Sequence, residues 1–205
     1  MQKTITLLFP FLLGMTLLAG CGQTSYPSRD FAADLGARAN EGMGMMGTSA
    51  FRANDVGVSF NYPFDWEINE NFVINTTTVR VVLQKIGFGE FTPNIFLLVQ
   101  NANSNEKNST QRAFERGLVA GLPKEERNKT FHFQKFEKGK FRGDDCIYMV
   151  YDTLRDGKVF ITTTRYVIFH GNQTFSFTFA CAPDDMQYDL RKKEFDALMN
   201  SVAFH

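Results

Sequence analysis

Alternation of apolar and polar side chains marks the β-strands that the sequence predicts. Neighbouring side chains of a strand point to opposite faces of a sheet, so an alternating stretch buries one face. Alternation or a short apolar run predicts strands at residues 56–62, 79–86 and 94–101. Pro63 ends the first of them because proline lacks the N–H that a sheet uses. A further strand carries Phe131 and Phe133, and Gly139 is expected to mark the turn after it.

Apolar residues at helical spacing predict two helices. The first has Asn108 or Ser109 as its N-cap and ends near residues 121–123, and its apolar face consists of Phe114, Leu118 and Val119. The second closes the chain, with Asp184 or Asp185 as its N-cap. Its apolar stripe consists of Tyr188, Phe195, Leu198, Met199 and Val202.

Two hairpins predict a three-stranded meander between residues 141 and 181. Asp156-Gly157 and Gly171-Asn172 are two-residue turn signals, and a turn of fixed length sets the register of the strands that it joins. Arg155 then faces Lys158, and His170 faces Gln173.

This register divides the side chains of the meander between two faces. One face receives the large side chains of Ile147, Met149, Tyr151, Tyr166, Ile168, Phe175, Phe177 and Phe179. The opposite face carries Tyr148, Val150, Val167 and Phe169 among polar residues, which is too apolar for open water. The sheet is therefore expected to be covered on both sides.

Three short motifs lie near the ends of these elements. They are Phe60-x-Tyr62-Pro63-x-x-Trp66, then Phe141 with Gly143, then Ser201 with Phe204. With the central and closing helices, they resemble the PsbP-like superfamily, which includes the DcrB-like envelope proteins of bacteria. The resemblance implies an α+β fold, an α/β/α sandwich around an antiparallel sheet with a C-terminal amphipathic helix. It implies no particular activity, because one fold can host unrelated binding roles.

The N-terminus has the three parts of a secretory signal peptide. Lys3 supplies a positive charge, residues 5–18 form an apolar run, and Ala19 and Gly20 are small. The run is too short to cross a membrane as a helix, which takes ~20 apolar residues. Residues 1–20 are therefore predicted to be a signal peptide that is removed.

The stretch Leu18-Ala19-Gly20-Cys21 resembles the lipobox of bacterial lipoproteins. The resemblance implies diacylglycerol on the thiol of Cys21, cleavage before this residue, and acylation of the new amino group, for example by palmitate. Two or three acyl chains anchor a protein durably, because each buried CH₂ contributes about 0.8 kcal/mol. Gly22 follows where an aspartate would resemble an inner-membrane retention signal. The anchor is therefore expected in the outer membrane, facing the periplasm.

The rest of the chain divides into a tether and one domain. Residues 21–54 are rich in small residues, Asn and Met without a sustained period, which predicts a lipidated flexible tether. Within it, residues 30–38 can form a short helix. Residues 55–205 are expected to form the PsbP-like domain. The chain has 22 basic and 22 acidic side chains, so its charge gives no reason to expect nucleic acid as a partner.

Cys146 and Cys181 are predicted to be free, buried thiols. In the predicted register Cys146 faces Val167, whereas Cys181 faces Thr162 on the other side of the sheet. Their Cα atoms would then lie beyond the ~7 Å that a disulfide can span.

Asp145 and His170 are the candidate polar site. The predicted register makes them diagonal neighbours at one end of the sheet, where an acid–base pair or part of a metal site could form. The alternative is an ordinary polar sheet end with no chemistry. His132 is expected to face solvent, because it alternates with Phe131 and Phe133.

Lys135, Lys138, Lys140 and Arg142 form a local basic run, which Glu137 and the adjoining aspartates dilute. A solvated hairpin is the interpretation that this mixture favours. Acidic lipid headgroups or a protein partner are the alternative contacts.

The sequence contains no G-x-S-x-G, H-E-x-x-H, C-x-x-C or phosphate-binding glycine loop, so neither a catalytic residue nor a cofactor is predicted. The leading hypothesis is a non-enzymatic binding or accessory domain that engages another envelope component. The first alternative is a periplasmic lipoprotein that binds a small ligand or metal near Asp145 and His170. An enzyme is the third.

Overall fold

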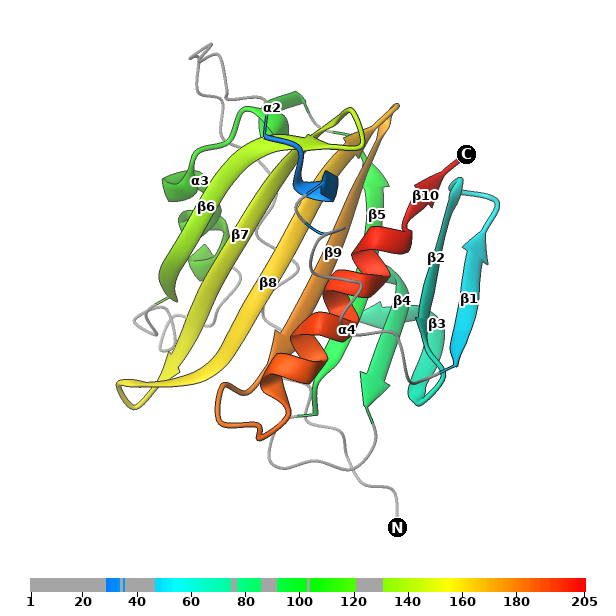
Figure 1. Ribbon diagram of the computed structural model, residues 1–205. Helices are drawn as coiled ribbons and strands as arrows, with labels where there is room; N and C mark the ends of the chain where they lie inside the picture. Colours follow the sequence, from blue (N-terminus) through cyan, green and yellow to red (C-terminus); the bar gives the residue numbers. More distant parts are fainter. Residues whose placement is uncertain are drawn as a thin grey trace.

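The computed structural model describes residues 29–33, 35, 47–74, 77–85, 92–102, 104–120 and 131–205. Its centre is a seven-stranded antiparallel sheet with the order β3 (Trp66–Ile74), β4 (Thr77–Lys85), β5 (Asn94–Asn101), β9 (Gln173–Cys181), β8 (Lys158–His170), β7 (Asp144–Arg155) and β6 (Phe131–Phe141). A smaller antiparallel sheet has the order β1 (Thr48–Ala53), β2 (Val58–Pro63) and β10 (Ala203–Phe204) (Figure 1).

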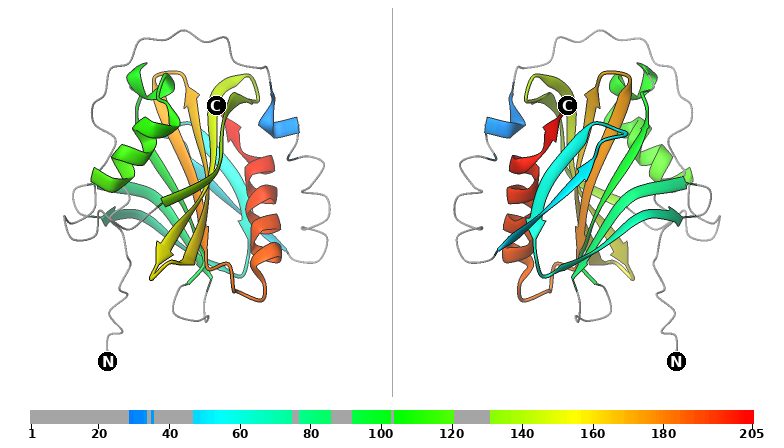
Figure 2. Two further views of the ribbon diagram at one scale, coloured as in Figure 1. Left: turned by 90° about the vertical axis from the view of Figure 1, so that its left-hand side faces the viewer. Right: turned by 90° about the vertical axis from the view of Figure 1, so that its right-hand side faces the viewer.

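Helices cover both faces of the large sheet. Helix α4 (Tyr188–Ser201) lies along one face, next to the small sheet, whereas α2 (Ser104–Lys107) and α3 (Gln111–Ala120) lie on the other side (Figure 2). The predicted α+β fold, with helices on both faces of an antiparallel sheet and a C-terminal helix, is confirmed.

The meander shows one correct and one wrong register. Across the β8–β9 turn His170 pairs with Gln173 and Phe177 with Tyr166, as predicted. Across the β7–β8 turn Arg155 does pair with Lys158, but a β-bulge between Thr153 and Leu154 shifts the register beyond it. A bulge inserts one extra residue, and a shift of one residue moves every later side chain of the strand to the opposite face.

The bulge therefore exchanges the two faces of β7. Tyr148 now pairs with Tyr166 and lies on the α4 face, where the sequence placed Ile147, Met149 and Tyr151. Those three residues pack instead on the α3 face, against Val167 of β8 and the apolar side of α3, which is Phe114 and Leu118. The prediction that the sheet is covered on both sides is confirmed.

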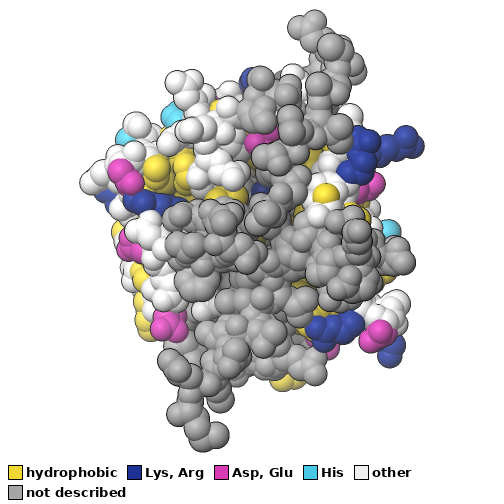
Figure 3. Space-filling model, turned by 180° about the vertical axis from the view of Figure 1, so that it is seen from behind, with side chains coloured by type: hydrophobic (Ala, Val, Ile, Leu, Met, Phe, Trp, Pro, Cys, Tyr) yellow, Lys and Arg dark blue, Asp and Glu magenta, His cyan; other side chains and the backbone are white. Residues whose placement is uncertain are grey.

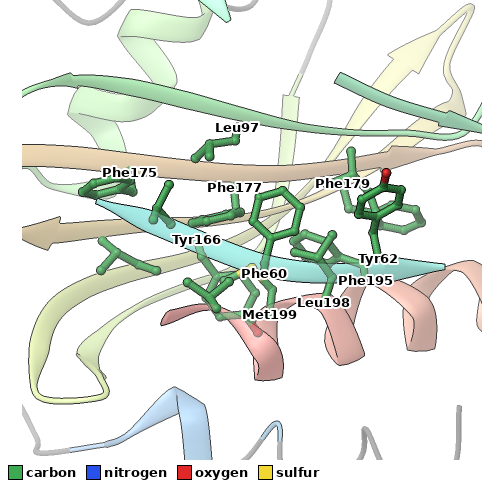
Figure 4. Close-up of a cluster of buried hydrophobic side chains, with 14 of the residues drawn as sticks. Phe60, Tyr62, Leu97, Tyr166, Phe175, Phe177, Phe179, Phe195, Leu198 and Met199 are labelled. Carbon is green, nitrogen blue, oxygen red and sulfur yellow. The ribbon is translucent and has the colours of Figure 1, made fainter. Parts of the chain in front are cut away.

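Phenylalanines of β9 form the centre of the larger core. Phe175, Phe177 and Phe179 are fully buried and point to the α4 face. The ring of Phe179 stacks on Phe195 of α4 at 5.5 Å between centroids. Phe60 of β2 meets Phe177 edge-on at 5.9 Å, so the small sheet packs on the same face (Figure 4).

Two predicted boundaries are wrong. Gly139 does not mark a turn but lies inside β6, and the turn falls at Arg142-Gly143, where both φ angles are positive (52° and 94°). Helix α4 begins at Tyr188, later than a cap at Asp184 or Asp185 implies. The carboxylate of Asp185 instead accepts the N–H of Gln187 at 2.8 Å, which builds a turn just before the helix.

The prediction that residues 21–54 are a tether is wrong for the described part of that range. Residues 48–53 form β1, which pairs with β2 and buries Phe51 and Ala53. Residues 31–33 and 35 are helical, and Phe31 and Leu35 are buried in the larger core. The composition of this stretch does not indicate the burial, because its few apolar residues lie far apart among polar ones. Residues 1–28 lie outside the described residues.

Cys146 and Cys181 are free and buried, as predicted, but they lie on the same face of the sheet. Cys146 pairs with Ile168, and Cys181 pairs with Thr162, six residues earlier on β8. At about 3.3 Å per residue these positions are roughly 20 Å apart along the strand, too far for a disulfide. Burial raises the pKa of the Cys181 thiol to about 12, and that of Cys146 well above its usual range.

The buried N-terminal residues predict where the chain can be shortened. A chain that begins at Arg29 should unfold like one that begins at Cys21. A chain that begins at Arg52 loses Phe31, Leu35 and Phe51, which are each buried to below 5 % exposure. At ~1.5–3 kcal/mol for each side chain, this loss is comparable with the whole stability of many domains. Urea unfolding of the three chains measures this loss of stability. Equal midpoints would mean that Phe31, Leu35 and Phe51 add nothing to the core and belong to the tether.

Candidate functional site

The two residues of the predicted polar site lie on opposite faces of the sheet. Asp145 of β7 pairs with Phe169 rather than with Ile168, because of the bulge. His170, the last residue of β8, therefore shares a face with Asp144 and not with Asp145. The pairing of Asp145 with His170 is wrong by one residue, although the sheet end is correct.

His170 is held between a carboxylate and an aromatic ring. Its Nδ1 lies 2.8 Å from Oδ2 of Asp144. Its ring stacks on Phe204 of β10, with 4.6 Å between centroids and 14° between the planes. About 40 % of the histidine side chain remains exposed. The histidine thus joins the end of the large sheet to the C-terminal strand, and one ring nitrogen is occupied by this contact.

Asp145 is occupied on the other face by two lysines. Lys140 Nζ lies 2.7 Å from Oδ1, and Lys107 of α2 bonds to Oδ2. Burial alone would raise the pKa of Asp145, but hydrogen bonds from both lysines outweigh it and lower the pKa below its usual value. The carboxylate is therefore an ion-pair partner and is poorly suited to accept a proton near neutral pH.

Among the described residues, no group of three or more His, Cys, Asp or Glu side chains could hold a metal ion. His132 faces solvent, as predicted, with 69 % of its side chain exposed. In the basic run, Lys135 pairs with Glu137 at 3.3 Å, and Lys138 donates to the Lys107 carbonyl at 3.2 Å.

Polar side chains form a second cluster on the α3 face, which the sequence patterns did not single out. Arg165 lies at its centre and is 8 % exposed; its Nε donates to Ser176 Oγ at 2.6 Å. Tyr151 also bonds to this arginine, and burial raises the tyrosine pKa. Burial also raises the pKa of Glu106, although the positive charge of Arg165 acts to lower it. The signal was present in the sequence as alternate polar positions on β8 and β9.

Several buried oxygen atoms of this cluster have no hydrogen-bond partner. They are Oε1 of Glu106 and the hydroxyls of Thr174 and Thr178. An unpaired buried polar group costs free energy and calls for an explanation. In the view from behind, Lys and Arg side chains lie at both edges of the described surface (Figure 3).

A third cluster of polar side chains lies under α4. It explains the role of Trp66, the last residue of the Tyr62-Pro63-x-x-Trp66 motif. The indole N–H of Trp66 donates to Glu194 Oε2 at 3.0 Å. Glu194 also lies 3.3 Å from Arg191 and 3.8 Å from Lys85, which itself pairs with Asp65. These contacts tie the start of β3 and the end of β4 to the helix.

The other motif residues also fasten the two sheets together. Ser201 accepts the N–H of Asn61 in β2 at 2.7 Å, and Phe204 carries the His170 stack. Most of the polar side chains that the sequence singles out are therefore occupied by contacts that hold the fold together.

The sequence matches no family profile and no curated protein. The fold is similar to that of cyanobacterial PsbP (CyanoP) from Synechocystis sp. PCC 6803, with a TM-score of 0.62 and 16 % identity over 80 % of this chain and 96 % of that one. It is also similar to LpqN of Mycobacterium tuberculosis, whose TM-score is 0.50 at 9 % identity over 86 % of this chain and 98 % of that one. The chain thus has a PsbP-like fold. No described helix is long and apolar enough to cross a membrane.

The network under α4 predicts a large effect at Glu194. Glu194→Ala removes the carboxylate that faces Arg191, Lys85 and Trp66, all of which are buried. Breaking a buried ion pair on one side leaves an uncompensated charge, so we expect a loss of about 3–5 kcal/mol in the free energy of unfolding. Glu67→Ala, at an exposed position of β3, is the matched control and should change little. Similar losses for both variants in urea titration would mean that the network adds nothing.

The unpaired hydroxyl of Thr178 predicts a change of the opposite sign. Thr178→Val keeps the shape and removes a buried group without a partner, so the free energy of unfolding should rise by about 1 kcal/mol. Thr162→Val is the control, because that buried hydroxyl donates to Asp152 at 2.8 Å and its removal should destabilise. If both variants lose stability, the Thr178 hydroxyl has a partner in solution.

Proposed function

We propose that this protein is a lipid-anchored lipoprotein of the bacterial cell envelope, with a non-enzymatic accessory domain that engages another envelope component. The observation that carries the proposal is the lipobox-like Leu18-Ala19-Gly20-Cys21, which lies eight residues before the first described contact of a PsbP-like domain. Acyl chains on Cys21 anchor the domain, expected at the outer membrane and facing the periplasm.

The state of the polar sheet end supports an accessory domain over an enzyme. General acid–base catalysis by the pair that the sequence suggested needs Asp145 and His170 on one face, with a pKa near the working pH. Asp145 is instead held by two lysines that lower its pKa, and His170 lies on the opposite face of the sheet. LpqN, with a similar fold, is described as involved in cell envelope biogenesis, which is in keeping with a role in the envelope.

A second candidate function is small-ligand binding on the α3 face. The observation that favours it is the set of unpaired, buried oxygens around Arg165. Native mass spectrometry of the protein purified from cells tests this candidate. A bound mass that disappears in Thr178→Val supports it, and a bare protein mass in both forms counts against it.

The anchor is tested by replacing Cys21 with Ser. The serine hydroxyl cannot form the thioether, so processing should stop and the precursor should accumulate without lipid. Cys146→Ala, at a buried thiol of the domain, is the matched control and should be processed normally. Intact mass and membrane fractionation read the outcome. Normal maturation and membrane partition of Cys21→Ser would contradict the proposal.

A further inference from the structure

The chain just after the proposed anchor is fastened to one end of the sheet. The carbonyl of Arg29 accepts the N–H of Lys140 in β6 at 2.7 Å, and Asp30 forms a parallel bridge to the same residue. Oδ1 of Asp30 accepts the N–H of Ala32 at 2.9 Å and that of Arg142 at 3.4 Å. We call residues 29–33 and 35 the clamp segment.

Close packing at Gly139 makes this contact specific. A Cβ at Gly139 would lie 2.4 Å from the Arg29 carbonyl oxygen and 2.9 Å from the Phe31 ring. No side chain can therefore replace this glycine while the clamp segment stays in place. Phe31 is 4 % exposed, with its ring 5.5 Å from that of Tyr148, and Leu35 is 3 % exposed. The clamp segment is thus bound by backbone, carboxylate and apolar contacts together.

The clamp segment sets how far the domain can lie from the anchor. Arg29 is the eighth residue after Cys21, and a chain spans at most ~3.3–3.6 Å per residue, or roughly 28 Å here. Without the clamp segment, the next described contact is the Gly47 carbonyl with the Phe64 N–H. That point is 26 residues from Cys21, which allows roughly 90 Å. The bound segment therefore shortens the reach about threefold.

The end of the sheet that holds the clamp segment carries charges of both signs. Lys107 and Lys140 share the carboxylate of Asp145. Asp144 lies at the same end, bonded to His170, and the exposed Asp30 belongs to the clamp segment itself.

The opposite end of the domain also carries charges of both signs. The thirteen residues of β8 separate the two ends by about 40 Å. At the far end the exposed residues include Asp156 and Asp184, but also Arg155 and Lys158 beside the same β7–β8 turn. The bound clamp segment, and not a difference in charge, is therefore what distinguishes the two ends.

We propose that the clamp segment holds this end of the sheet, with the β6–β7 and β8–β9 turns, toward the phospholipid headgroups of the membrane that holds Cys21. This rests on the proposed lipid anchor. The end with the β7–β8 turn then faces away from the bilayer, where a partner can reach it.

Headgroup quenching tests this orientation on the lipidated full-length protein in vesicles. One reporter cysteine replaces Asn172 in the β8–β9 turn at the end that holds the clamp segment, and the other replaces Val159 at the far end; both positions are exposed. Cys146 and Cys181 are buried and should stay unlabelled. In phosphatidylcholine vesicles with a headgroup quencher, the probe at 172 should be quenched severalfold more than the probe at 159. The same difference is expected in phosphatidylglycerol vesicles, because the length of the chain and not its charge sets the orientation.

Gly139→Ala should remove most of the difference between the two probes, because its methyl group displaces Arg29 and Phe31. Asp30→Ala, at an exposed position, weakens the same contact with less risk to folding. His132→Ala, on the same strand but away from the clamp segment, is the matched control and should behave like wild type. Equal quenching at both positions in the unmodified protein, a difference that appears only in phosphatidylglycerol, or an unchanged difference in both clamp variants would overturn the inference.

The lipid anchor and the orientation can fail separately. Intact mass shows before reconstitution whether Cys21 carries acyl chains. If it does not, the proposed function falls, and the orientation falls with it. If the protein is lipidated and the probes show no preferred end, the orientation alone is wrong.

Discussion

The strict alternation of side chains along β8 and β9 is the constraint on which the rest of the structure depends. Phe175, Phe177 and Phe179 point to one face and bind α4 and the small sheet. The positions between them point to the other face, which holds the Arg165 cluster and packs on α3. Because both faces are covered, neither strand can shift by one residue without placing phenylalanines among polar groups and threonines in the larger core.

Turns and periodicity allow the sequence to predict one part of the fold and not another. The Gly171-Asn172 turn predicts the β8–β9 register correctly because no bulge intervenes. The β7–β8 register fails since nothing in the sequence signals that Phe160 of β8 is an extra residue opposite Thr153 and Leu154. This one residue also misplaces Tyr148 and pairs His170 with the wrong aspartate. The burial of Phe31 escapes prediction for another reason: it depends on the close approach of this residue to Gly139, which exists only in the folded sheet.

The polar residues divide by what they do in the fold. Glu194 and Ser201 fasten α4 to neighbouring strands, and Asp144 fixes His170 against the C-terminal strand. What distinguishes the two ends of the long sheet is the N-terminal segment that is bound at one of them. A domain fastened in this way is suited to present one defined surface, and the fold itself can host unrelated binding roles.

The amide hydrogen of Lys140 gives the most direct test that the N-terminal segment holds the domain in place. This N–H points away from β7 and donates to the Arg29 carbonyl, so its hydrogen exchange reports on the clamp segment alone. In the full-length protein we expect exchange as slow as that of the amides that join β6 to β7, and fast exchange in Gly139→Ala. Exchange at the rate of an unstructured peptide in the unmodified protein would contradict a bound segment, and with it a domain held close to the membrane.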